Sequence, residues 1–117
     1  MNDQYGPNSG ELVTLIEKIR TVALERAEKL FAAWDAIWDA SRDSATYEAV
    51  DATCYEHWIA ARHAAMEAMP DDALDAWDAI WDATLAVVVR ERISKKGFSA
   101  LYEPWRSVME AHDDDGE

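Results

Sequence analysis

The sequence predicts an all-α fold: an antiparallel helical bundle of three long helices plus a short C-terminal helix. Two observations favour this class. Apolar residues recur at steps of three and four along most of the chain, and the four glycines all lie outside the expected helix interiors. Half of the residues are apolar and 30% are charged, a composition that favours folding over disorder. With 117 residues, the chain has enough length for one core and too little for two.

The chain divides into three predicted segments. Residues 1–10 contain two glycines, a proline and two asparagines, and they predict a flexible N-terminal lead-in. Residues 11–112 form a single helical-bundle domain. Residues 113–117 carry four acids around one glycine, and we expect them to be an acidic, disordered tail.

The first helix is predicted over residues 11–42. At 1.5 Å per residue it would be roughly 48 Å long, unless it breaks near residues 30–33. Because its partners are shorter, its first two turns should overhang them and expose apolar side chains, which favours cover by the C-terminal helix or by a second subunit. The candidate homodimer interface therefore consists of Leu12, Val13, Leu15 and Ile16.

The second helix is predicted from an Asp-Ser cap at residues 43–44 to Met69, and Pro70 separates it from the third. The third should end at Gly97, which suits a left-handed cap, after two lysines that complement the helix dipole. The short C-terminal helix that follows should be divided by Pro104. Short connections make neighbouring helices antiparallel.

One octapeptide, AWDAIWDA, occurs twice, at Ala33–Ala40 and at Ala76–Ala83. In each copy the two tryptophans stand four residues apart, on one helix face. The plain interpretation is that they fill the core beside small alanines. The alternative is that one or two tryptophans stay exposed as binding anchors, with Trp105 and Trp58 as candidates.

The net charge of −13 is unevenly distributed. Residues 11–30 carry four acids and four bases, whereas residues 31–87 carry twelve acids and two bases. This charge excludes direct binding to nucleic acid, which needs lysine and arginine, and docking on an anionic membrane. Like charges four residues apart destabilise a helix, so the middle of the chain accepts a loss of stability that invites a functional explanation.

Aspartates in the middle segment recur at steps of four, each step advancing about 6 Å along a helix. A row of such carboxylates can imitate phosphates and occupy the basic nucleic-acid-binding site of a partner protein. The chain resembles the small acidic DNA-mimic inhibitors of phages and mobile elements in size, charge and lack of catalytic motifs, although it carries no family motif. The predicted acidic face consists of Asp35, Asp39, Asp43, Asp71, Asp75, Asp78 and Asp82.

The sequence therefore predicts a non-enzymatic interaction protein of a prokaryote or phage, with a plainly solvated acidic surface as the competing interpretation. A homo-oligomeric scaffold joined through the start of the first helix is the alternative function. Catalytic residues, cofactor and metal are predicted to be absent, because phosphate loops and ExxH patterns are missing. A metal site on Cys54 and His57 is a weaker hypothesis that needs further ligands. One cysteine and no visible signal or membrane span favour the cytoplasm.

Overall fold

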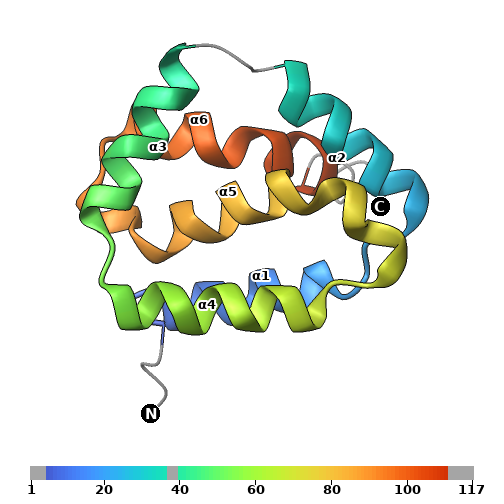
Figure 1. Ribbon diagram of the computed structural model, residues 1–117, viewed down its shortest axis with the longest axis horizontal. Coiled ribbons are helices and arrows are strands. Elements are labelled where there is room, and N and C mark those ends of the chain that lie inside the picture. Colours follow the sequence, from blue (N-terminus) through green and yellow to red (C-terminus); the bar gives the residue numbers. More distant parts are fainter. Residues whose placement is uncertain (1–4, 37–39, 111–117) are drawn as a thin grey trace.

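The computed structural model describes residues 5–36 and 40–110. Within these residues the fold is all-α, as predicted, with six α-helices and no strand (Figure 1). No helix in this part of the chain is long and apolar enough to cross a membrane. The predicted bundle of three long helices is wrong in detail. The molecule extends over 35 × 33 × 26 Å, so a straight helix of roughly 48 Å has no room in it.

The described part of the chain forms its helices in short pieces. The longest is α4, with 14 residues. In order, the elements are α1 (Ser9–Ile19), α2 (Leu24–Ala36), α3 (Ala40–Ala52), α4 (Tyr55–Ala68), the 3₁₀ segment η1 (Asp71–Ala76), α5 (Trp77–Val88), the 3₁₀ turn η2 (Arg90–Arg92), α6 (Lys95–Trp105) and the π-helical turn η3 (Arg106–Glu110).

Two predicted long helices are interrupted at threonines. The Thr21 hydroxyl donates to the Lys18 carbonyl at 2.7 Å, and the Thr53 hydroxyl donates to the Val50 carbonyl at 2.8 Å. In both cases the backbone N–H of the threonine donates to the same carbonyl, so the hydroxyl reinforces a tighter last turn of the helix. The first prediction therefore splits into α1 and α2, and the second into α3 and α4. The connection at 37–39 lies outside the described residues.

The predicted end of the third helix at Gly97 is wrong. Helix α5 ends at Val88, and Ser94 caps a new helix, with its side-chain oxygen accepting the Gly97 N–H at 3.0 Å. Gly97 does not adopt a positive φ. A Cβ at this position would stand 2.5 Å from the Glu48 Oε1 atom, so a side chain here would displace the Glu48 carboxylate. Helix α6 also passes through Pro104 and ends one residue later, instead of being divided there.

The core is organised around α5, which crosses the middle of the molecule with α6 on one side and α4 and α1 on the other (Figure 1). Its residues from Ala79 to Val88 are buried apart from Trp81, and a helix that is apolar all round belongs in a core. Only its first turns, around Trp77 and Asp78, reach the surface. This arrangement leaves the second octapeptide half in the core and half accessible.

The start of the first helix does not overhang. Leu12, Leu15 and Ile16 are buried in the core of the chain itself, and only Val13 is partly exposed, at 38%. Helix α1 packs against α4 and α5, which cover these side chains. The predicted homodimer is untested, but the exposed apolar surface on which it depended is taken up by internal packing.

The structure describes part of the predicted N-terminal lead-in, residues 5–10, and none of the predicted C-terminal tail. Tyr5 is buried, and the Asn8 side chain donates to the Val87 carbonyl at 2.9 Å, so part of the predicted flexible lead-in packs on the domain. The predicted acidic tail, residues 113–117, lies outside the described residues.

Candidate functional site

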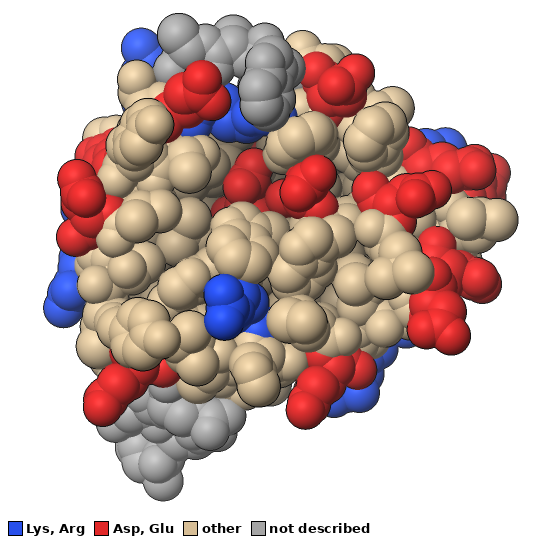
Figure 2. Space-filling view, in the orientation of Figure 1, with Lys and Arg blue, Asp and Glu red and all other residues tan. Residues whose placement is uncertain are grey.

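The seven aspartates of the predicted acidic face fall into three groups. Exposed side chains belong to Asp35, Asp43, Asp71, Asp75 and Asp78. Asp39 lies outside the described residues, and Asp82 is buried, with 8% of its surface exposed. Figure 2 shows acidic side chains at the centre of this face and along the side where η1 lies, within a surface that is otherwise mostly neutral.

The exposed aspartates do not form the expected rows. Asp35 belongs to α2 and Asp43 to α3, two helices that run in different directions (Figure 1). Asp71 and Asp75 lie on the 3₁₀ segment η1. In a 3₁₀ helix residues three apart share a face, so Asp75 aligns with Asp72 and not with Asp71. The aspartates therefore present several separate acidic positions, without one regular phosphate-like spacing.

Asp82 turns inward and is held by partners from other helices. The Trp34 indole N–H donates to its Oδ2 atom at 2.9 Å. The guanidinium group of the buried Arg42 lies 4.0 Å from the centre of the Trp34 ring and donates to the Trp34 carbonyl at 2.7 Å. Burial raises the pKa of Asp82 from 3.8 to about 6, while the Trp34 hydrogen bond and the Arg42 charge act in the opposite direction.

The hydrogen bond from Trp34 to Asp82 joins the two octapeptides. Trp34 is the first tryptophan of the first copy, and Asp82 is the second aspartate of the second copy. If the two copies exchange roles, the equivalent pair is the first tryptophan of the second copy, Trp77, with the second aspartate of the first copy, Asp39. Asp39 lies outside the described part of the chain. Sequence reasoning missed this contact, although Arg42 offered a signal, because it is one of only two basic residues in the acidic middle segment.

Beside this cluster lies a hollow of about 680 Å³ between α2, α3 and α5, which we call the tryptophan hollow. Its lining residues are Trp34, Arg42, Asp43, Thr46, Tyr47, Trp77, Asp78, Trp81 and Asp82. The structure thus gathers three of the predicted aspartates around aromatic side chains, and leaves Asp35, Asp71 and Asp75 elsewhere on the surface.

The tryptophans behind the hollow pack edge to face. The Trp77 and Trp81 rings lie 5.5 Å apart at 77°, and the Trp58 and Trp81 rings lie 4.9 Å apart at 84°. Such pairs add about 0.5–1.5 kcal/mol to the effect of burial. Of the two candidate exposed anchors, Trp105 is completely buried and Trp58 is half-buried in this cluster. Among the described tryptophans, Trp34, Trp77 and Trp81 line the hollow.

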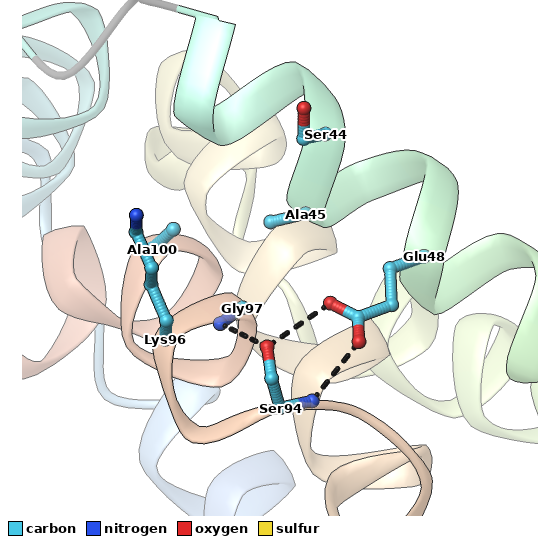
Figure 3. A pocket seen from close by; sticks show the side chains of 7 residues that line it. All are labelled: Ser44, Ala45, Glu48, Ser94, Lys96, Gly97 and Ala100. Carbon is cyan, nitrogen blue, oxygen red and sulfur yellow. Dashed lines mark hydrogen bonds between the residues drawn. The ribbon is translucent and has the colours of Figure 1, made fainter.

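A second pocket, of about 260 Å³, lies between α3 and the start of α6 (Figure 3). The Glu48 carboxylate accepts the Ser94 backbone N–H at 3.1 Å and the Ser94 hydroxyl at 3.2 Å. A carboxylate at a helix N-terminus is stabilised by the unpaired N–H groups and the helix dipole. Because the chain's own Glu48 occupies this position, the pocket is a structural joint between two helices.

Cys54 and His57 do not gain further ligands. Both are half-buried, and the gap that they line with Pro7 and Arg92 measures about 10 Å³. Within the described part of the chain, no three His, Cys, Asp or Glu side chains are grouped so that they could hold a metal ion. Glu91 lines the same gap, but among the described residues it does not complete a group of three ligands with Cys54 and His57.

Comparison with known proteins adds no relative: no protein family matches the chain, and no curated protein or solved structure is significantly similar to it. The fold and the surface by themselves define the class, an all-α domain with unpaired surface aspartates and one aromatic hollow. Its function must be argued from that geometry.

Proposed function

We propose that the protein is a non-enzymatic interaction protein whose exposed aspartates occupy a basic site on a partner protein. The single observation that carries the proposal is that five aspartates from four elements are exposed and unpaired. None of the ion pairs found between described residues includes Asp35, Asp43, Asp71, Asp75 or Asp78.

The ion pairs found between described residues join acids and bases outside the middle segment, residues 31–87. Arg90 pairs with Glu11, Arg92 with Glu91, and Arg106 with Glu103. A surface evolved only for solubility would distribute bases among its acids, as these segments do. The middle segment carries only two bases for its twelve acids, so most of its carboxylates remain available to an external cation. Clustered charge of one sign attracts an oppositely charged partner and raises the rate of association.

A finer version of the proposal is that the basic site is a nucleic-acid-binding groove, so that the protein acts as an inhibitor by taking the place of DNA. The net charge of −13 supports this version. The irregular spacing of the carboxylates limits how closely the surface can imitate DNA. Mimicry would depend on the overall negative field and on a few positions, and not on one row of carboxylates matching successive phosphates.

The proposal is tested by capture from a lysate of the producing organism at low salt. A captured protein supports it only if binding is lost in the triple variant Asp35→Asn, Asp71→Asn and Asp75→Asn. The matched control is Glu17→Gln, Glu25→Gln and Glu28→Gln, which removes the same charge from exposed positions in the balanced segment.

If both triple variants lost binding equally, net charge alone would explain the loss, and the assignment of binding to Asp35, Asp71 and Asp75 would be overturned. Full retention in the first variant would do the same. Release of the captured protein by a DNA duplex supports the finer, inhibitory version, because contacts with a nucleic-acid-binding site compete directly. A captured protein that the duplex does not release contradicts that version and leaves the wider proposal standing.

A further inference from the structure

The tryptophan hollow has the size and charge of a binding site for a cation. Its volume of about 680 Å³ lies within the range of protein ligand sites, which is roughly 300–1,000 Å³. Three carboxylates and one guanidinium group line it, those of Asp43, Asp78, Asp82 and Arg42. Asp43 and Asp78 are exposed at its edge. The net negative charge would repel an anion and attract a positively charged group.

The first octapeptide already shows how this chain binds a guanidinium group. Arg42 lies over the ring of Trp34, eight residues before it in the sequence. The same offset from the equivalent tryptophan, Trp77, leads to Leu85, which is buried. Among the described residues no arginine or lysine lies over Trp77. In the second copy, Arg62 lies 5.6 Å from the centre of the Trp81 ring. The Trp77 ring, beside the Asp78 carboxylate, is therefore the tryptophan of this copy that has no cation over it among the described residues.

We infer that an arginine side chain of the partner protein enters the tryptophan hollow, lies over the Trp77 ring and pairs with Asp43 and Asp78. This inference rests on the proposed function and specifies the group that the acidic surface recognises. Arginine is favoured over lysine because its planar guanidinium group both stacks on aromatic rings and binds carboxylates with two N–H groups. Tyr47, which is 75% exposed and also lines the hollow, provides a second aromatic surface.

The inference can be tested without the partner. The probe is a capped Gly-Gly-Arg-Gly-Gly peptide, titrated at low salt while the indole N–H signals are followed by NMR. Binding should be saturable and should shift the signals of Trp77 and Trp81. The lysine peptide should bind severalfold more weakly, and the uncharged citrulline peptide should not bind. Equal binding of the citrulline peptide, or no shift at Trp77, would overturn the inference.

A substitution of the ring tests the aromatic contact. Trp77→Leu should weaken binding of the arginine peptide about tenfold, within the two- to thirtyfold range of a cation–π contact. Tyr55→Leu is the control, because it also replaces an aromatic ring by leucine but lies outside the hollow. Unchanged affinity in Trp77→Leu, or an equal loss in the control, contradicts the assignment. The NMR spectrum of each variant shows directly whether it is folded.

A second variant avoids the half-buried ring altogether. Asp43→Asn with Asp78→Asn should weaken binding of the arginine peptide about tenfold or more, since both ion pairs are lost. Asp72→Asn with Asp75→Asn removes the same charge from η1, outside the hollow, and should change binding by less than about threefold. Equal effects of the two pairs would overturn the inference.

The hollow and the wider proposal can fail separately. A partner that is captured through Asp35, Asp71 and Asp75, but is indifferent to Trp77→Leu, would refute the hollow and leave the proposed function intact. Peptide binding at the hollow without any aspartate-dependent partner would refute the proposed function instead.

Discussion

Replacing Asp82 with asparagine should change how the stability of the protein depends on pH. The substitution keeps an acceptor oxygen for the Trp34 indole N–H and removes the buried carboxylate charge. Burial raises the pKa of Asp82 in the folded protein from 3.8 to about 6. Below the lower value the carboxyl group is protonated in the folded and the unfolded chain alike, so its ionisation has no effect on stability there.

Between these two pH values the folded state binds more protons than the unfolded state. The free energy of unfolding therefore falls as the pH rises through this window, and the loss is complete above about pH 6. At 1.36 kcal/mol for each pKa unit, the full loss is about 3 kcal/mol. Most of it, about 2 kcal/mol, falls between pH 4 and pH 7. Asparagine cannot ionise, so the variant lacks this contribution.

The assay is urea unfolding followed by tryptophan fluorescence at fixed ionic strength, from pH 4 to pH 7. The quantity compared is the difference in unfolding free energy between the native sequence and Asp82→Asn. It should change by about 2 kcal/mol across this range, in favour of the variant at the higher pH. Asp75→Asn, which removes the same charge from an exposed position, measures the contribution of net charge. Parallel curves for the native sequence and Asp82→Asn would refute the reasoning.

Three further predictions concern the packing of the same fold. Trp34→Phe replaces the indole by a smaller aromatic ring that has no N–H to donate to the buried Asp82 carboxylate, so it should lower the unfolding free energy in urea by about 1–3 kcal/mol; an unchanged midpoint would contradict the hydrogen bond. Leu12→Ala should destabilise by about 2–5 kcal/mol in thermal unfolding, and Val13→Ala far less, because Leu12 is buried and Val13 is 38% exposed. Comparable losses would indicate that Leu12 lies outside the core. Ser94→Ala removes the cap of α6 and should lower the stability in urea by about 1 kcal/mol, whereas Ser99→Ala, inside the helix, serves as the control and should have a smaller effect.

The helix boundaries show where local patterns stop being informative. Periodicity predicts helix almost everywhere in this chain, correctly, because it depends on residues within one turn of each other. It does not show where one helix should end, because the apolar stripe continues through each break. Thr21 and Thr53 lie at helix ends, where each hydroxyl donates to the carbonyl three residues earlier. Other threonines donate to the carbonyl four residues earlier inside helices, so the residue type by itself does not mark the ends. Gly97 fitted a local pattern for a helix end, but in the structure it lies in the first turn of α6, close to Glu48, which is 49 residues earlier in the sequence.

Some properties of the acidic surface follow from the sequence, and others depend on the tertiary structure. The sequence alone determines that the protein is helical, that its net charge is −13, and that the acids of its middle segment lack nearby bases. Only the tertiary structure decides that Asp82 is buried while Asp78, one turn earlier, stays exposed. It alone brings Trp34 to Asp82 and opens a hollow beside Trp77. Burial depends on which helices pack together, and two identical octapeptides acquire different surroundings because the chain folds them against different neighbours.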